Sequence, residues 1–218
     1  IAPSGGEPVV LIGEDTYAAD GVRIDADVLR WNVPLGSGVE SYYVRPSGFW
    51  QTHVCGAEVL ANAVLAAAFG AHEAGAGRAI MELYSGAGLL TQPLAIATGE
   101  KGTVYAMEAA HEAVGDARSN LEDLPWARCR TARIDARAVE GINGDVVVAD
   151  PPRAGLGTEL AAILGEAKIG RIVLVSCDPA SMARDVAVMR GCGRKVTSFE
   201  AIDIFPNTHH FECVTVVE

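Results

Sequence analysis

The sequence predicts an α/β fold in which helices cover both faces of a mostly parallel, doubly wound sheet, with an antiparallel C-terminal strand and a small N-terminal β-rich region. Two observations support this prediction. Half of the 218 residues are hydrophobic and only 21% are charged, which is enough apolar surface for one full-sized core. From residue 79 onward, short and almost continuously apolar runs alternate with helical patterns, as is typical of parallel sheets buried on both faces.

The N-terminal part differs in composition from the rest. It is rich in Gly and Asp, and its short alternating runs predict strands and turns at residues 9–12, 21–25 and 42–44. Apolar residues then recur at helical spacing over 51–69, and a stretch of small residues at 70–77 ends this helix. We therefore expect a β-rich region at 1–48 and a larger α/β domain at 49–218.

The strands of the α/β domain are short apolar runs. Four buried strands are expected at Ala79–Tyr84, Thr103–Glu108, Asp145–Asp150 and Arg171–Cys177. Two more, Lys195–Phe205 and His209–Val217, are joined by a turn at Pro206 and Asn207. In such sheets, ligands bind at the carboxyl ends of the strands, beside the point where the strand order reverses. The residues at these ends are therefore the candidates for a functional site.

Composition and charge exclude several classes of protein. The net charge of −11 argues against a chain that grips nucleic acid by bulk electrostatics. No basic-then-apolar leader and no apolar run near ~18–20 residues occur, so we expect neither a signal peptide nor a membrane span, and the start at Ile1 suggests a fragment. The five cysteines are scattered and form no C-x-x-C pair, which favours a reduced, cytoplasmic setting without disulfides or a metal site: Cys55, Cys129, Cys177, Cys192 and Cys213.

A glycine turn follows the first strand of the predicted sheet. In Tyr84-Ser-Gly-Ala-Gly88, the two glycines, Gly86 and Gly88, let the backbone approach a ligand closely at a helix N-terminus. Glu108 ends the next strand, where a carboxylate can accept hydrogen bonds from ribose hydroxyls, so the spacing suits a nucleoside-bearing cofactor. NAD and S-adenosylmethionine both use this layout. The rigid Asp150-Pro-Pro-Arg153 lip favours a methyltransferase.

Two reactive side chains occur near the end of the sequence. Cys177 lies just before a helix start formed by Asp178 and Pro179, where the helix dipole lowers the pKa of a thiol and a neighbouring carboxylate raises it. Asp150 ends the adjacent strand, so both groups should share one rim. Glu212 interrupts a strand that is otherwise apolar, and a buried carboxyl group with a raised pKa is suited to proton transfer. Inert packing of Cys177 and an exposed position of Glu212 are the alternatives.

These motifs together resemble the RNA uracil-C5-methyltransferase family, the S-adenosylmethionine-dependent enzymes that make 5-methyluridine in tRNA and ribosomal RNA. The resemblance covers about residues 42–218 and rests on an ordered set of motifs: Phe49-Trp-Gln51, Glu82-Leu-Tyr-Ser-Gly-Ala-Gly88, Asp150-Pro-Pro-Arg-Ala-Gly155, Ser176-Cys-Asp-Pro179, Ala183-Arg-Asp185 and Asp203-Ile-Phe-Pro-Asn-Thr-His-His-Phe-Glu212. It implies a Rossmann-like class I methyltransferase fold, with a catalytic domain at 49–218 after part of a central β-rich region at 1–48. RNA is the implied partner.

The resemblance also implies a role for each matching residue. Cys177 would be the nucleophile that adds to C6 of uracil, and Glu212 the base that removes the C5 proton after methyl transfer. S-adenosylmethionine would be held by Gln51, Tyr84, Glu108 and Asp150, with Gly86 and Gly88 of the turn and with Asp135 near the adenine.

The sequence departs from the family pattern at several positions. Ser85 stands where the family often has cysteine and Leu89 where it has asparagine, which would remove one cofactor contact, and Asp178 replaces a common asparagine. We find no counterpart here of the family's RNA-binding β-barrel or of the cysteine cluster that holds iron and sulfur in some members. Two other functions therefore stay open: methylation of an exocyclic amine, suggested by the Asp-Pro-Pro lip, and a non-catalytic nucleoside-binding module.

Overall fold

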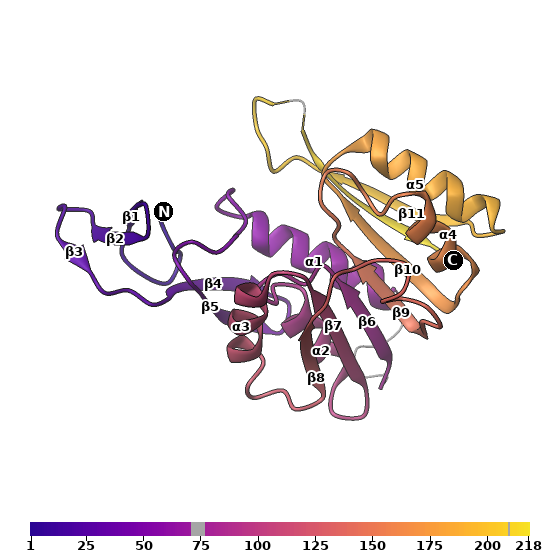
Figure 1. The fold of residues 1–218 in the computed structure, drawn as a ribbon, viewed down its shortest axis with the longest axis horizontal. Coiled ribbons are helices and arrows are strands. Elements are labelled where there is room, and N and C mark those ends of the chain that lie inside the picture. Colours follow the sequence, from indigo (N-terminus) through magenta and orange to yellow (C-terminus); the bar gives the residue numbers. More distant parts are fainter. Residues whose placement is uncertain (71–76, 209) are drawn as a thin grey trace.

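The computed structural model describes residues 1–70, 77–208 and 210–218. Within these residues a seven-stranded sheet forms the centre of the molecule, in the order β11-β12-β10-β9-β6-β7-β8 (Figure 1). The bounds of its strands are β6 Ala79–Leu83, β7 Thr103–Glu108, β8 Ala127–Thr131, β9 Asn143–Ala149, β10 Lys168–Ser176, β11 Val196–Ile202 and β12 Glu212–Val217.

All strands of this sheet run in one direction except β12. β6 pairs in parallel with both β7 and β9, so the strand order reverses at β6. β10 continues the parallel arrangement beside β9, whereas β12 runs antiparallel between β10 and β11. The predicted sheet, mostly parallel with an antiparallel C-terminal strand, is confirmed. The last strand, expected from His209, begins at Glu212, and residue 209 itself lies outside the described residues.

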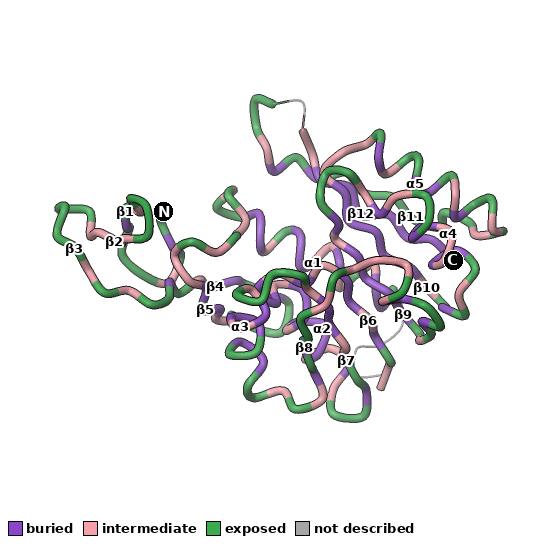
Figure 2. The backbone as a smooth tube through the Cα atoms, in the orientation of Figure 1, coloured by how far each residue is buried: buried purple, intermediate pink, exposed green. Residues whose placement is uncertain are grey.

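Helices cover both faces of the sheet (Figure 1). Their bounds are α1 Gly56–Phe69, α2 Thr91–Thr98, α3 His111–Asn120, α4 Thr158–Glu166 and α5 Pro179–Gly191. Alternate residues of β10 enter two separate cores: Val173 and Val175 pack with α1, α2 and α3, whereas Ile172 and Leu174 pack with α4 and α5. This double burial explains why the strand is apolar from Ile172 to Val175, and Figure 2 shows buried backbone along the sheet.

The first helix begins later than the sequence predicts. Instead of starting near Gln51, α1 starts at Gly56, because the preceding backbone turns at His53: its carbonyl oxygen accepts from the Gly56 amide at 2.8 Å, and its Nδ1 accepts from the Cys55 amide at 3.2 Å. Gln51 is thereby left in the connecting segment. The helix ends at Phe69 as expected, and residues 71–76 of the expected small-residue linker lie outside the described residues.

The N-terminal region contains two small antiparallel sheets. β1 (Val9–Ile12), β2 (Asp15–Ala18) and β3 (Arg23–Ile24) form the first, at the end of the molecule farthest from the C-terminus (Figure 1). β4 (Leu29–Leu35) and β5 (Gly38–Val44) form the second, a hairpin that contacts α1 and α3. The hairpin thus connects the N-terminal region to the α/β domain. The division at residue 48 stays a prediction. The hairpin lies before this residue in the sequence, but it packs against α1 and α3, which lie after it.

Candidate active site

The glycine turn after β6 has an unusual backbone. Tyr84, Gly86 and Gly88 all have positive φ, at 66°, 54° and 90°. A side chain on Gly86 would meet no atom within 4 Å, so this part of the turn faces open space, whereas one on Gly88 would meet Ala117 of α3 at 3.5 Å. The turn therefore presents Gly86 to a ligand and rests its other side on α3.

The carboxylate of Glu108 holds this turn in place. Its Oε2 accepts a hydrogen bond from the Gly86 amide at 3.1 Å, and its Oε1 accepts one from the Ala110 amide at 2.8 Å. Each carboxylate oxygen has a second lone pair, so Glu108 keeps acceptor capacity for ligand hydroxyls. The residue thus both shapes the turn and lines the space beside it.

A cavity of about 560 Å³, here called the first cavity, opens at the carboxyl ends of β6, β7 and β9. Five predicted cofactor residues line it: Gln51, Tyr84, Gly86, Glu108 and Asp150. Gly88 and Asp135 do not. Gly88 is turned toward α3, and the Asp135 carboxylate accepts from the Ala138 amide at 3.1 Å in the loop after β8.

Two carboxyl groups, of the buried Glu82 and the half-buried Asp150, lie in the wall of the first cavity. Burial, together with the nearby Asp150 and Glu108, raises the pKa of Glu82 to about 8. Burial, with a contribution from Glu212, raises that of Asp150 to about 7. Glu82 is 1% exposed, and its Oε2 has no hydrogen-bond partner among the described residues. Our sequence reasoning did not propose Glu82, although a glutamate inside an apolar strand is the same signal that pointed to Glu212.

Cys177 and Glu212 meet at the end of two neighbouring strands. Ser176 pairs with Cys213 across β10 and β12, and Cys177 and Glu212 are the next residues beyond that pair. Burial raises the pKa of Glu212 to about 6, and its Oε2 has no partner among the described residues. The sequence predicts that Cys177 and Asp150 share one rim because their strands are neighbours. β10 does lie beside β9, with Leu174 opposite Ala149.

The surroundings of Cys177 raise the pKa of its thiol. Burial is the main cause, followed by the negative charges of Glu212 and Asp150, while the positive charge of Arg153 opposes them. Asp178, the neighbouring carboxylate whose effect on the thiol the sequence left open, caps α5 by accepting from the Ser181 amide at 2.7 Å. The carboxylates that act on the thiol therefore come from the two neighbouring strands.

The loop after Asp150 is tied to the helix that follows Cys177. Asp185 of α5 is fully buried, and its Oδ2 accepts from the Leu156 amide at 2.7 Å. Arg184 donates to the other oxygen of Asp185 at 2.8 Å and to the carbonyl oxygen of Ala154 at 2.7 Å. These bonds give the Ala183-Arg-Asp185 motif a structural role, because they fix the loop that carries Asp150 and Arg153.

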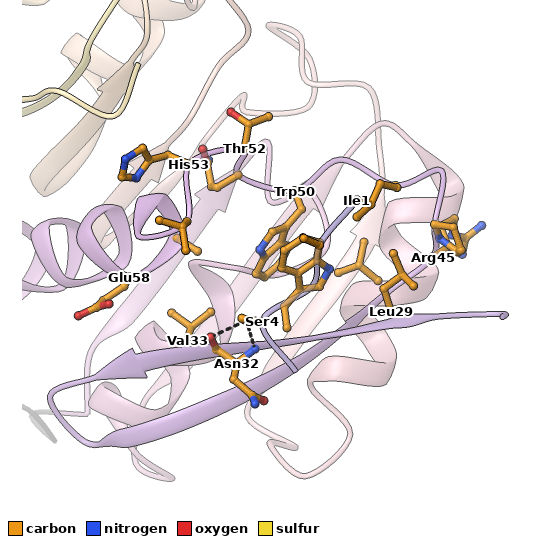
Figure 3. Close-up of a pocket in the computed structure, with 18 of the residues that line it drawn as sticks. Ile1, Ser4, Leu29, Asn32, Val33, Arg45, Trp50, Thr52, His53 and Glu58 are labelled. Carbon is orange, nitrogen blue, oxygen red and sulfur yellow. Dashed lines mark hydrogen bonds between the residues drawn. The ribbon is translucent and has the colours of Figure 1, made fainter. Parts of the chain in front are cut away.

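A second cavity, of about 440 Å³, lies between the hairpin and the start of α1 (Figure 3). Trp31 and Trp50 stack in its wall with ring centroids 5.5 Å apart, and His53 and Glu58 also line it. Gln51 borders both cavities. The segment between β5 and α1 therefore separates the two spaces.

Among the described helices none is long and apolar enough to cross a membrane, and no cluster of described side chains could hold a metal ion.

Comparison with known proteins places the chain in a family. The family model described as tRNA (uracil-5-)-methyltransferase matches residues 22–218. Among curated proteins, an uncharacterized RNA methyltransferase of Streptomyces avermitilis is 38% identical over 82% of this chain and 41% of its own length. Another, of Bifidobacterium longum, is 34% identical over 93% of this chain and 49% of its own length.

A solved structure has the same fold. The tRNA (uracil-54, C5)-methyltransferase of Pyrococcus abyssi, crystallised with S-adenosyl-L-homocysteine, is 30% identical and superposes with a TM-score of 0.72 over 91% of this chain and 47% of that one. The chain thus spans about half the length of the relatives it matches. The Rossmann-like methyltransferase fold expected from the sequence is confirmed, and the chain belongs to the tRNA (uracil-5-)-methyltransferase family.

Proposed function

We propose that this chain carries the active site of an S-adenosylmethionine-dependent methyltransferase that acts on C5 of uracil in RNA through a covalent bond to Cys177. One observation carries the proposal: Cys177, Glu212 and Asp150 lie at the ends of three adjacent strands, and Asp150 also lines the cavity that contains the glycine turn. Family membership and the likeness to the Pyrococcus abyssi enzyme support the same reading.

The residues of the first cavity fit the proposed cofactor. Gly86 leaves room for a nucleoside beside the turn, and Glu108 has acceptor capacity for ribose hydroxyls. The Oε2 atom of Glu82 is buried and has no partner among the described residues. It would accept a hydrogen bond from the ammonium group of S-adenosylmethionine. Gln51 and Asp150 would complete the contacts. When bound, S-adenosylmethionine supplies an electrophilic methyl group.

The two reactive residues would act on the base in turn. The Cys177 thiolate forms a bond to C6 of uracil, and the C5–C6 π electrons move onto the C5–C4–O4 enolate, so that C5 becomes nucleophilic enough to be methylated. Glu212 then takes the C5 proton. The C–H electrons restore the C5–C6 double bond and expel the Cys177 thiolate. A carboxyl group with a pKa of about 6 is ionised at neutral pH and can act as this base.

RNA would have to present a single nucleotide to this rim. An enzyme that modifies a base takes it out of its stack, at a cost of a few kcal/mol that is smaller for a loop nucleotide. Phe49, which lines the first cavity and is 75% exposed, offers an aromatic face for an unstacked base. Thiol, carboxylate and aromatic ring therefore come from three different parts of the chain. The class of RNA, tRNA or ribosomal, would be selected outside this cavity.

The proposal is tested by trapping. RNA that contains 5-fluorouridine carries fluorine in place of the C5 proton, so the final elimination is blocked and a covalent complex should accumulate with the full-length protein and S-adenosylmethionine. Cys177→Ser should abolish the complex, while Cys55→Ser, which changes an exposed thiol, should not. Methylation of natural RNA that survives in Cys177→Ser would refute the covalent mechanism and favour methylation of an exocyclic amine. No methylation by the wild-type protein would favour a binding module.

A further inference from the structure

The N-terminal hairpin makes a direct hydrogen bond to the glycine-turn region. Tyr42 of β5 is fully buried, and its hydroxyl donates to the carbonyl oxygen of Leu89 at 3.1 Å. Leu89 directly follows Gly88 and lines the first cavity. The bond joins residues 47 positions apart. A tyrosine hydroxyl this deeply buried needs a partner, and the chain supplies one at the edge of the turn.

Asn120 makes a second connection between the same two elements. This residue ends α3 and is 8% exposed. Its Oδ1 accepts from the Tyr43 amide at 2.8 Å, and its Nδ2 donates to the Tyr43 carbonyl oxygen at 3.1 Å and to the Ala87 carbonyl oxygen at 3.0 Å. One amide side chain thereby bonds both to the backbone of the hairpin and to the backbone of the glycine turn.

An ion pair closes the arrangement beside the cavity. Arg45, just after β5, donates to Asp116 of α3 at 2.9 Å, and the Asp116 side chain is 6% exposed. Both residues line the first cavity. In Figure 1 the hairpin runs alongside α3. Three contacts therefore hold the hairpin against the elements that form one side of the cavity.

We propose that the hairpin is a positioning element of the cofactor site, so that its docking and cofactor binding are energetically coupled. The proposal rests on the cofactor site proposed above. The turn holds Tyr84, a non-glycine residue, at positive φ, which is costly to maintain. Bonds to the carbonyl oxygens of Ala87, in the turn, and of Leu89, directly after it, favour the conformation that presents Gly86. Loosening the hairpin should then weaken cofactor binding, and by reciprocity a bound cofactor should stabilise the hairpin.

Tyr42→Phe is the cleanest test, because it removes one hydroxyl and keeps the ring in its core. We expect the dissociation constant of S-adenosylhomocysteine, measured by calorimetry on the full-length protein, to rise about fivefold or more, as is usual for coupled sites. Asn120→Ala should have a larger effect. Tyr43→Phe is the matched control: it removes the hydroxyl of the neighbouring, exposed tyrosine, whose bonds to Asn120 use only its backbone, so the hairpin keeps its contacts and affinity should stay unchanged.

Hydrogen exchange gives a second readout that a purely structural role would not change. In the wild-type protein, S-adenosylhomocysteine should slow exchange of the β4 and β5 amides, and Tyr42→Phe should reduce this effect. Wild-type affinity in both variants, or no ligand effect on hairpin exchange, would overturn the coupling. A wild-type protein that binds no S-adenosylhomocysteine would instead refute the cofactor site itself, so the two failures are distinct.

Discussion

Cys177 and Glu212 lie side by side, directly beyond the pair formed by Ser176 and Cys213, at the same end of the neighbouring antiparallel strands β10 and β12. Glu212 is 6% exposed and, after burial, is the largest cause of the raised pKa of Cys177. A thiol and a carboxyl group placed in this way can act one after the other on the same base. Since the thiol would be needed at the start and the carboxylate at the end, separate substitutions should separate the steps.

Glu212→Gln should stop the reaction after the covalent bond has formed. The amide cannot take the C5 proton, so the RNA should stay attached to Cys177 even when its uridine is unmodified. We expect release of methylated RNA to slow by about 10²–10⁴-fold, the usual contribution of a general base. Denaturing gels with labelled RNA measure the adduct. Glu200→Gln, on the exposed strand β11, is the control, and release at the wild-type rate in Glu212→Gln would exclude the role as base.

The rate should rise with pH in two stages. Glu212 must be ionised to act as a base, so kcat/KM should fall as the pH drops through its pKa of about 6. Cys177 must be a thiolate, and its raised pKa places the second rise in the alkaline range. Arg153→Gln removes the positive charge that lowers the thiol pKa, so this second rise should move to higher pH, while Arg153→Lys should keep it. A profile that is the same in Arg153→Gln would contradict this prediction.

The strands and their ends could be predicted from the sequence because each depends on local pattern. The apolar run of β10 indicated burial on both faces, and parallel strands bring their carboxyl ends to one edge. The placement of Cys177 and Asp150 at one rim could therefore be predicted from the sequence alone. The role of Gly86, to let the backbone approach a ligand, could be predicted from the glycines of the turn.

The contacts between distant segments could not be predicted in this way. Asn120 bonds Tyr43 across 77 positions, and Asp116 bonds Arg45 across 71. Polar residues in a short amphipathic helix such as α3 indicate a solvent-exposed face by default, and only the docking of the hairpin makes these two buried. The predicted start of α1 was wrong for a related reason. The turn at His53 is held by hydrogen bonds and leaves no hydrophobic periodicity in the sequence from which it could be predicted.

Glu82→Gln should change both stability and cofactor binding. The pKa of Glu82 rises from 4.5 to about 8 in the folded chain, so between these values the folded state holds more protons than the unfolded state and loses stability as the pH rises. The glutamine variant should lose less stability over this range in urea unfolding. It should also bind S-adenosylhomocysteine more weakly, because an amide cannot ionise when the ammonium group of the ligand approaches, whereas the Glu82 carboxyl group can. A pH dependence as steep as that of the wild-type protein would exclude the raised pKa.

Asp185→Ala should reduce catalysis more than stability alone explains. The substitution leaves the Leu156 amide without its buried acceptor and frees Arg184, so we expect a loss of about 1–3 kcal/mol in the free energy of unfolding. The loop that carries Asp150 and Arg153 then loses its attachment to α5, so kcat should fall. The affinity for S-adenosylhomocysteine should fall as well, because Asp150 is one of the proposed cofactor contacts.

Asp145→Ala is the matched control for this prediction. Its carboxylate accepts from the Ala79 amide at 2.8 Å, at the amino end of β6 and β9, so the variant removes an exposed bond between a carboxylate and a backbone amide at the opposite edge of the sheet. Urea unfolding and single-turnover methylation of both variants separate the two effects. Because the loop held by Asp185 reaches the reactive rim and Asp145 lies at the opposite edge, the control should keep its kcat, and its cost in stability should be smaller because Asp145 is exposed. Equal losses of kcat in the two variants would show that Asp185 acts on stability alone.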